Sequence, residues 1–348
     1  MLKLYQKFIS KRYIKNFIIL FLALELFFTG IDLMQNFKYL PNSANLQIVY
    51  TYNKFLSFIN YTLPLSLVFS MISTIFNLIK SSELVALYSL GNSKQDIIKP
   101  IFLISLFITF AYISLGFTNF TSSSYKADNI KKHGTISTTT NDLFLKSKNN
   151  YISIKRLNPI KKEAEGIKIF KSDKGKLKEI IKSKKGTFQS NSWILNDVNI
   201  IKIKKDRLDI SQKNSLKALK DFKPEVIDNL YKGRGGLNII DSILAIKLLK
   251  KEHIDTKRVL AHLYNMIIFP LFAPIVILAL FYPLPLQRRG TNIALLSSVY
   301  IFSTMLIWGV IFTMSRIAQN GTISPFMGIV FPIILLLLAT IYIVFKHK

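Results

Sequence analysis

Long stretches without charge alternate with short basic segments along most of the chain. With histidine counted as neutral, residues 55–79, 100–125, 259–287, 290–315 and 317–345 carry no charged side chain. Each stretch is at least as long as the roughly 20 apolar residues that cross a hydrocarbon core about 30 Å thick. The pattern therefore predicts five membrane-spanning helices.

A sixth span is predicted at residues 16–37, although Glu25 and Asp32 interrupt its apolar pattern. Because basic residues precede this stretch, a cleaved signal peptide is the alternative. The stretch is long for a signal peptide, contains acids and lacks a cleavage signature of small residues, so a retained first span is favoured. The basic residues before it are Lys3, Lys7, Lys11, Arg12 and Lys15.

A block with a different period lies between the third and fourth spans. Residues 150–157, 166–188 and 193–210 contain short runs in which β-branched or aromatic residues alternate with lysine. Such alternation is typical of strands with one buried and one wet face, and turn signals interrupt it. We expect an antiparallel, partly open sandwich here, with turns at 172–175, 185–186 and 196–197.

The helical period returns after the glycine-rich stretch 233–236. Apolar residues in the segment 237–252 recur at helical spacing and predict a helix that leads into the fourth span. The fold class expected is an α-helical membrane protein with six spans, three before and three after an inserted all-β domain. The predicted divisions of the chain are residues 1–118, 119–236 and 237–348. The helical apolar positions are Ile240, Ile243, Leu244 and Leu248.

The net charge of +28 invites a nucleic-acid interpretation, so the location of the charge matters. The segment from Asn119 to Lys257 holds 31 of the 47 basic and 15 of the 19 acidic residues. No recognition helix, zinc motif or aromatic-basic RNA signature accompanies it, which argues against nucleic-acid binding. The chain has no cysteine, which excludes disulfides and thiolate chemistry.

Basic residues in the short loops predict the orientation of the spans. They favour a cytoplasmic location for both termini and for the loop at 80–99, whereas the long central block is exempt from the rule and is placed outside. The bases on the predicted cytoplasmic side are the five before the first span with Lys80, Lys94, Lys99, Arg288, Arg289, Lys346 and Lys348; those on the other side are Lys38, Lys54 and Arg316.

Recognisable catalytic chemistry is nearly absent from the sequence. There is no HExxH, no GxSxG and no carboxylate cluster, and the four histidines are dispersed. A G-x-x-x-x-G-K-[ST] loop is also missing, so the chain does not bind ATP through a P-loop. Any work driven by a nucleotide must come from a partner chain.

The segment SSELVALYSLGNSKQDI, residues 81–97, is a short amphipathic piece between two spans. Ser81 or Ser82 is expected to cap a helix, Glu83 to lie in its first turn, and Gly91 to supply a left-handed end. Ser93 and Asp96 have the spacing of a capping box that starts the third span.

One face of this short helix carries Leu84, Leu87 and Tyr88. An interfacial helix resting on lipid headgroups is one interpretation. A helix that docks into a protein groove with a basic residue is the other, because the polar side has Glu83 rather than lysine or arginine. The residues alone leave the two interpretations about equal.

The sequence resembles the lipopolysaccharide export permeases of the LptF/LptG family nearly from end to end. The resemblance rests on Arg12, Tyr13, Ile14 and Phe17, on the Leu63-Pro64-Leu65 passage, and on SSELVALYSLGNS. LKSKNNYISIKRL, GIKIFKSDKGKL, PLPLQRRG and NGTISPFMGIVFPIILL are also similar to segments of that family. The passage Thr29-Gly30-Ile31-Asp32 looks slightly more like LptG than LptF.

The resemblance implies six spans, a periplasmic β-jellyroll and a location in a Gram-negative inner membrane. It implies three partners: a paralogous permease, a dimeric cytoplasmic ATPase that binds ATP and Mg²⁺, and a periplasmic jellyroll protein with one membrane anchor. No cofactor is expected in this chain. Glu83 matches the acid of the coupling helix that docks into the ATPase, and Leu84, Leu87, Tyr88 and Gly91 share that segment.

Lipopolysaccharide is a polyanionic lipid, so its cavity needs apolar walls and cations near the outer ends of the spans. Lys38, Lys54 and Arg316 are the candidates, with ordinary snorkelling to headgroups as the alternative for each. Glu25 is expected to face the cavity or the partner permease, because an unpartnered acid in a membrane is costly. Asp32 is expected near the outer interface.

The function expected is therefore that of a transport subunit without catalytic activity of its own. A membrane-anchored envelope receptor or scaffold, whose β domain binds a ligand without transport, is the competing class. A membrane-embedded enzyme is a third class, and it lacks candidate catalytic clusters.

Overall fold

A computed structural model of the whole chain describes residues 4–134, 140–147, 150–159, 161–173, 176–190, 192–203, 208–219, 223–224, 236–251, 255–284 and 292–347. The chain divides into two units, which we name the helical unit and the β unit. The helical unit consists of Met1–Lys38, Thr51–Thr121 and Lys257–Lys348, and the β unit of Tyr39–Tyr50 and Ser122–Thr256.

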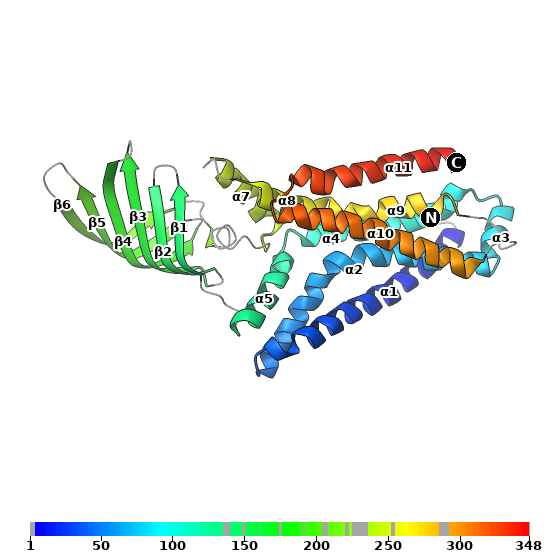
Figure 1. Cartoon of the computed structure of the whole chain (residues 1–348), viewed down its shortest axis with the longest axis horizontal. Helices are drawn as coiled ribbons and strands as arrows, with labels where there is room; N and C mark the ends of the chain where they lie inside the picture. The colour runs from blue at the N-terminus through cyan, green and yellow to red at the C-terminus, as the bar shows by residue number, and fades with distance from the viewer. Residues whose placement is uncertain are drawn as a thin grey trace. The chain divides into compact units, whose positions relative to one another are not determined.

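Six helical segments of the described chain are long and apolar enough to cross a membrane, three before the strands in sequence and three after them (Figure 1). This confirms the predicted fold class. The segments are α1 with η1 (Leu4–Asn36, Phe37–Tyr39), α2 (Ala44–Lys80), α4 (Lys94–Leu115), α8 with η3 and α9 (Lys257–Ile267, Phe269–Leu271, Phe272–Phe281), α10 (Ile293–Gln319), and η4 with α11 (Phe326–Val330, Phe331–His347).

The helix boundaries differ from the uncharged stretches for physical reasons. α1 begins at Leu4 rather than near residue 16, because a helix continues beyond the hydrocarbon region with its basic residues at the surface. α4 ends at Leu115 although the uncharged stretch runs to 125; the Thr118 hydroxyl donates to the Leu115 carbonyl at 2.7 Å. The interruption η3 coincides with Pro270, which lacks a backbone donor, whereas the last span begins with the π-helical turn η4 directly after Pro325.

Shorter helices connect these segments. The predicted helix at 237–252 is present as α7, where the side chain of Asn238 accepts from the Asp241 amide at 2.7 Å. The Lys223 ammonium donates to the Asp241 carboxylate at 2.6 Å. Gly233 and Gly235, which precede the predicted helix, lie outside the described residues. The short helices are α3 (Glu83–Ser89), η2 (Asn119–Ser122), α5 (Ser123–His133) and α7 (Ile239–Lys251).

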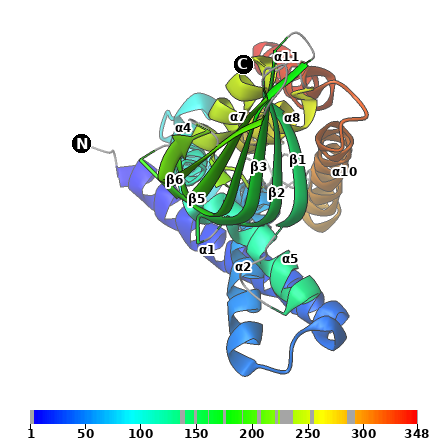
Figure 2. The same ribbon diagram turned by 90° about the vertical axis from the view of Figure 1, so that its left-hand side faces the viewer.

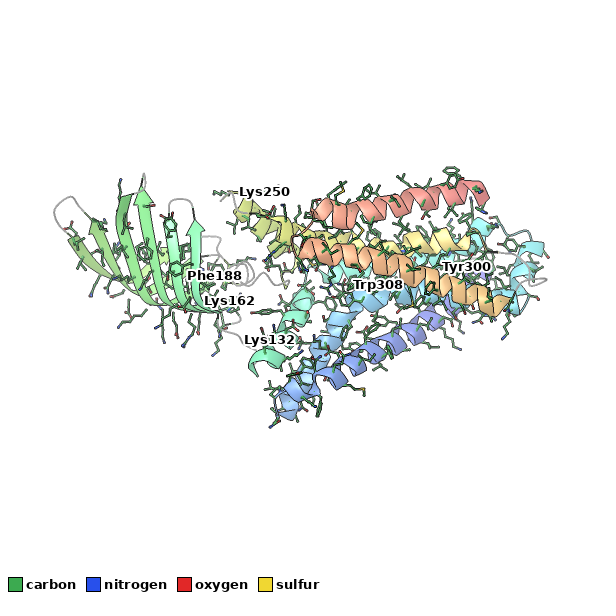
Figure 3. All side chains as sticks on the ribbon, viewed as in Figure 1. Lys132, Lys162, Phe188, Lys250, Tyr300 and Trp308 are labelled. Carbon is green, nitrogen blue, oxygen red and sulfur yellow. The ribbon has the colours of Figure 1, made fainter. Side chains whose placement is uncertain are left out.

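The helical unit packs around α2, which is the most buried of the spans, whereas α1 and α10 are the least buried. Side chains of Leu67, Met71 and Ile75 on α2 are fully buried in one apolar cluster. Aromatic contacts bring α10 against α2: Tyr300 (Figure 3) lies edge-on to Phe76 at 5.7 Å between ring centroids. The apolar surface left on α1 and α10 is therefore open to lipid or to another protein.

Hydrogen bonds between side chains tie the helices of this unit together. Tyr13 of α1 donates to the Leu67 carbonyl at 3.1 Å, and Asn16 donates to the Thr74 hydroxyl at 2.9 Å. Between α10 and α8, the Ser315 hydroxyl donates to the Asn265 side chain at 2.8 Å. Polar bonds of this kind hold membrane helices together where burial of apolar surface gives little driving force.

The β unit contains a six-stranded antiparallel sheet whose strands lie side by side in chain order (Figure 2). This confirms the antiparallel β domain. The sandwich interpretation implies a second facing sheet, and the described strands form one sheet. The strands are β1 (Thr140–Ser147), β2 (Asn150–Asn158), β3 (Glu163–Asp173), β4 (Lys176–Gln189), β5 (Ser192–Ile203) and β6 (Leu208–Ala218).

A crease crosses all six strands and explains how one sheet encloses a core. Asp142 on β1, Gly166 on β3 and Asp197 on β5 have left-handed backbones, with φ of 52°, 66° and 52°. They fall between paired positions of the ladder, opposite Lys155, Lys184 or Asn214 of the neighbouring strands. Residues of this kind bend a sheet and re-aim its side chains.

The crease reverses the alternation of buried and exposed positions. Buried residues are three apart across it, as in Ile154 with Leu157 and Leu195 with Val198, instead of the usual two. In the central strands β2 to β5 both arms therefore bury the same face, and residues of both arms belong to or pack against one core cluster. The buried Ser183 hydroxyl bonds to the carbonyls of Asn196 at 2.6 Å and Lys185 at 2.8 Å beside the crease.

One predicted turn is correct and two are wrong. β3 and β4 are joined between Asp173 and Lys176, as the signal at 172–175 predicts. The signals at 185–186 and 196–197 fall inside β4 and β5, where Asp197 lies in the crease and Gly186 is a paired position of the ladder. Gly186 is packed: a Cβ there would lie 2.6 Å from Cδ1 of Ile167.

Replacing Gly166 by alanine is expected to destabilise the β unit by about 3 kcal/mol, from backbone strain and overpacking together. A Cβ at this position would lie 2.7 Å from the Cβ of Lys155. Gly134 is the matched control, since its φ of 65° is similar and its Cβ would meet nothing within 4 Å; Gly134→Ala should cost only about 1 kcal/mol. Equal losses in thermal unfolding of the two variants would contradict the close approach at the crease.

Candidate functional site

The candidate coupling segment is α3, a two-turn helix that joins α2 to α4. The first turn of α1, α3 and the last turn of α11 lie at one end of the helical unit (Figure 1). The predicted side-chain cap at Ser81 or Ser82 is wrong. Ser82 occupies the N-cap position with a left-handed φ of 59° and makes no cap bond, while the Ser81 hydroxyl donates back to the Asn77 carbonyl at 3.0 Å. These residues complete the end of α2 instead, where free carbonyls accept such bonds.

The other end of α3 matches the prediction. Gly91 has a φ of 83°, and its amide donates to the Tyr88 carbonyl at 2.9 Å. The Asn92 amide donates to the Leu87 carbonyl at 3.3 Å, which completes a Schellman-type end. The capping box that starts α4 is present between Ser93 and Asp96. Both devices fix the direction in which the chain leaves α3.

The apolar face of α3 is covered by its own chain. Leu84 and Leu87 are buried in the core cluster of the helical unit, and the half-buried Tyr88 packs against the same cluster. Burial raises the pKa of Tyr88 to about 12, so its phenol stays neutral at physiological pH. This face anchors the helix and is not available to a lipid surface or a partner.

The opposite side of α3 is open. Ala86, Ser89 and Leu90 are exposed, and Leu90 has 78% of its side-chain surface accessible. Residues at these spacings follow one side of a helix. We name Ala86, Ser89 and Leu90 the outward ridge.

Glu83 forms a bidentate ion pair with Arg12 of α1. Nη2 of Arg12 donates to Oε1 of Glu83 at 2.9 Å, and Nη1 donates to Oε2. About one third of each side chain is exposed, 36% for Arg12 and 34% for Glu83. The guanidinium also lies 4.3 Å from the centre of the Phe8 ring. Sequence reasoning did not find this partner, although Arg12 belongs to the N-terminal stretch that carries the family resemblance.

Lys94 makes a second connection at the same end of the unit. Its ammonium donates to the Tyr282 carbonyl at 3.1 Å and to the His347 carbonyl at 3.4 Å. These carbonyls follow α9 and end α11, where a cation is favourable. Arg288 and Arg289, which contribute to the predicted orientation, lie outside the described residues.

The three predicted lipid-binding cations have different surroundings. Lys38 is exposed in η1. Nζ of Lys54 lies 3.7 Å from Oδ1 of Asp32, and both side chains are largely buried, so Lys54 neutralises an acid of its own chain. Arg316 is exposed and donates to the Tyr61 hydroxyl. Its guanidinium lies within 5.2 Å of the centres of the Tyr61 and Phe312 rings.

Lys54 and Tyr61, the residue that holds Arg316, are seven positions apart on α2. Two turns of helix place them on one side, separated by roughly 10 Å along the axis. The Arg316 guanidinium of α10 therefore contacts the side of α2 that carries Lys54. On α10, Phe312 stacks on Trp308, which is labelled in Figure 3, at 4.8 Å between ring centroids.

Glu25 does not face a cavity or a partner, contrary to the expectation. Its side chain is fully buried within the helical unit, and Oε2 accepts from the Thr62 hydroxyl of α2. Oε1 and the hydroxyl of Thr29, one turn along α1, have no partner among the described residues. Asp32 pairs with Lys54, and its expected place near the outer interface stays a prediction. Polar pairs therefore connect α1 and α2 along their length.

Within the described part of the chain, no three histidine, aspartate or glutamate residues are grouped so as to hold a metal ion. The features that could serve a function are therefore the ion pair of Arg12 with Glu83, the exposed cation Arg316 and the outward ridge of α3.

Comparison with known proteins supplies the family. The family model described as lipopolysaccharide export system permease LptF/LptG matches residues 7–346. Among curated proteins none matches the chain significantly. The family description covers both paralogues, so the slight preference for LptG stays a prediction.

Proposed function

We propose, since the chain belongs to the LptF/LptG family of lipopolysaccharide export permeases, that a separate cytoplasmic ATPase drives it through α3. The chain is a multi-pass membrane permease of lipopolysaccharide export. The observation that carries the proposal is the anchoring of α3: its apolar face is buried in its own chain while the outward ridge is left open. Because α3 is anchored in this way, a displacement imposed on it by the ATPase would be transmitted to the membrane-spanning helices.

The outward ridge is the proposed contact with the ATPase. The predicted coupling residues then have different roles. They are Glu83, Leu84, Leu87, Tyr88 and Gly91. Leu84, Leu87 and Tyr88 hold the helix against its own unit, and Gly91 directs the chain into α4. Small residues at Ala86 and Ser89 allow a close approach, and Leu90 offers an apolar anchor for a groove. ATP and Mg²⁺ belong to the partner chain, since this sequence has no P-loop.

A second permease is the proposed cover for α1 and α10. These spans carry large exposed apolar side chains, such as Phe27 at 59% on α1 and Phe302 at 66% on α10. A lateral cavity for a lipid needs helices on two opposite sides. In the described part of a single chain, the exposed faces of α1 and α10 have no such partner helices opposite them. Two such subunits would enclose a cavity whose opening and closing follows the ATPase.

The proposed lipid contact is centred on Arg316. Its exposed guanidinium is backed by aromatic rings on one side and has fork geometry suited to phosphate. Lys38 is exposed and can add charge. Lys54 contributes less than predicted from sequence, because Asp32 already balances it.

The β unit is the proposed route away from the membrane. β1 and β6 are the edges of the sheet, and exposed apolar side chains on them include Phe144 at 68% and Ile210 at 69%. Edges of this kind pair with strands of another sheet, which suits a single-anchored periplasmic jellyroll as the next element of a bridge. A Gram-negative inner membrane with both termini cytoplasmic is the proposed location, which the basic residues of the short loops support.

Replacing Ala86 by tryptophan is expected to lower copurification of the ATPase about tenfold or more, because bulk on the outward ridge prevents close approach. Asn320→Trp is the matched control, since Asn320 is exposed at the far end of α10 and should leave the complex intact. The chain is purified in mild detergent, and bound chains and lipids are identified by mass spectrometry. Recovery of the unaltered chain without an ATPase or lipopolysaccharide would favour the receptor or scaffold class instead.

A further inference from the structure

The face of the sheet that points away from its core carries a row of apolar residues. Ile152, Ile169 and Ile181 are buried in the core, so their neighbours along each strand point to the opposite side. On that side apolar residues pair directly from one strand to the next across β2 to β6 (Figure 2). Four strand spacings give this row a length of roughly 19 Å. Its members are Tyr151, Phe170, Ile180, Ile201 and Ile210.

This row is accessible from outside the chain. Its end members Tyr151 and Ile210 are 48% and 69% exposed, and its central members are half-buried. Beside Ile201 and Ile210, the paired residues Ile203 and Leu208 are also exposed and extend the apolar surface. We name the row, together with Ile203 and Leu208, the outer apolar row. A continuous exposed apolar surface of this kind marks a contact with another protein or with a membrane.

A basic row runs parallel to the outer apolar row, two residues away on each strand and therefore at roughly 7 Å. Lys168 of β3 lies directly opposite Lys182 of β4, and both are exposed. Their other cross-strand neighbours are Ser153 and Asn199, which carry no charge. Two lysines directly opposite each other destabilise a sheet. This pair therefore has a free-energy cost that anions from outside the chain would offset.

The other arm of the sheet, beyond the crease, has a different arrangement of charge. There Glu165 lies between Arg156 and Lys185 in paired positions. The Arg156 guanidinium is 3.4 Å from the Glu165 carboxylate, so these bases are balanced within the sheet. The uncompensated lysines lie instead beside the outer apolar row. Together they match an anionic lipid surface, which offers an apolar boundary to the row and phosphates to the lysines.

We propose that this face docks the β unit on a membrane surface that contains anionic phospholipid. The outer apolar row inserts roughly 5–10 Å, to the boundary between headgroups and acyl chains, and Lys168 and Lys182 bind phosphates beside it. The β unit is joined to membrane spans at both of its ends, so a bilayer is always within reach and a weak contact is sufficient. Strand addition at the edges β1 and β6 uses backbone groups and leaves this face open. The inference does not depend on the proposed ATPase.

A spin label measures the contact in the full chain, because a chain without cysteine accepts a label at one chosen position. Ile210→Cys places the label on the outer apolar row, and Ser215→Cys, exposed on the other arm of β6, is the matched control. The chain is reconstituted in nanodiscs of phosphatidylethanolamine with phosphatidylglycerol, or of phosphatidylcholine. With the anionic lipid, the label at position 210 should collide about tenfold less often with a water-soluble nickel reagent than in phosphatidylcholine. The label at position 215 should show no difference.

Removal of the lysine pair tests the part played by charge. Lys168→Gln combined with Lys182→Gln should abolish most of this difference, since each base near an anionic surface contributes roughly a fivefold change. The thermal midpoint should stay unchanged or rise when the like-charge pair is removed, so loss of folding would not explain the result. Lys185→Gln combined with Lys217→Gln is the matched control, because it removes two charges from exposed positions of the other arm and should leave docking intact.

Three results would overturn the proposal. Equal collision rates at position 210 in the two lipids would show that the face does not dock on anionic phospholipid. Protection that persists in the Lys168→Gln, Lys182→Gln variant would deny the lysines their role. Protection that appears only after lipopolysaccharide or a second permease chain is added would assign the outer apolar row to that molecule instead.

Discussion

Replacing Trp193 by alanine is expected to open the β unit under conditions in which the helical unit stays folded. Trp193 is fully buried and is the largest such side chain in the described residues. Its ring meets Phe188 edge-on at 5.6 Å between centroids. Removal of a buried tryptophan costs about 3–5 kcal/mol, a large share of the roughly 5–15 kcal/mol that stabilises a typical domain.

Hydrogen exchange of the full chain in detergent measures this prediction strand by strand. Amides of β2 to β5 should exchange roughly 100-fold faster or more in Trp193→Ala, whereas those of α2 should be unchanged. Phe144→Ala is the matched control, since Phe144 is an aromatic residue of the same sheet that is 68% exposed. Faster exchange in α2 as well would show that the two units unfold together.

The transmembrane part of the fold is predictable because the bilayer imposes a length. Uncharged stretches report the hydrocarbon thickness directly, so the number and order of spans follow from sequence. Helix ends do not follow, since Lys7, Lys11 and Lys15 continue α1 beyond the apolar region. Pro270 is an interruption and Pro325 a helix start, and sequence alone does not tell the two apart.

The crease is the part of the sheet that local patterns misread. Gly186 and Asp197 carry genuine turn chemistry, and the signals at 185–186 and 196–197 therefore predict chain reversals. In the sheet, the left-handed Asp197 serves a bend that needs neighbouring strands to exist, and Gly186 is a paired position packed tightly against Ile167. Residue types that tolerate a φ above zero are visible in sequence, but the choice between a turn and a crease is made by pairing across the sheet.

The candidate site shows the same limit. Periodicity finds that Leu84, Leu87 and Tyr88 share a face of α3 and cannot say what covers it. In the structure, Leu84 and Leu87 are buried in the core of the same chain. The partner of Glu83 is 71 residues away in sequence, a separation over which no local pattern carries information. Long-range ion pairs are for this reason the least predictable part of the site.

Glu25 shows how a contact between distant residues lowers the free-energy cost of an acid within a span. A carboxyl group in the membrane is tolerated when it faces protein and finds a hydrogen bond. Thr62 supplies one from α2, and the Lys54 ammonium neutralises Asp32 seven residues farther along α1. With Asn16 bound to Thr74 nearer the start of α1, polar contacts fix how α1 is rotated against α2. The acids that interrupt the first span thus hold it in register.

Replacing Glu25 by lysine should therefore prevent stable packing of α1, whereas Glu25→Gln should be tolerated. Glutamine keeps the size of the side chain and an oxygen that accepts from Thr62, so a change within about 1 kcal/mol is expected. Lysine places an ammonium at a fully buried position opposite a hydroxyl donor, at a cost of about 3 kcal/mol or more. Leu26→Lys is the matched control, since Leu26 is 64% exposed and a lysine there can extend to the surface.

Thermal unfolding in detergent should rank the variants, from most to least stable, as Glu25→Gln, then Leu26→Lys, then Glu25→Lys. Equal losses for the two lysine substitutions would mean that α1 is penalised for charge in general and that its register does not depend on Glu25.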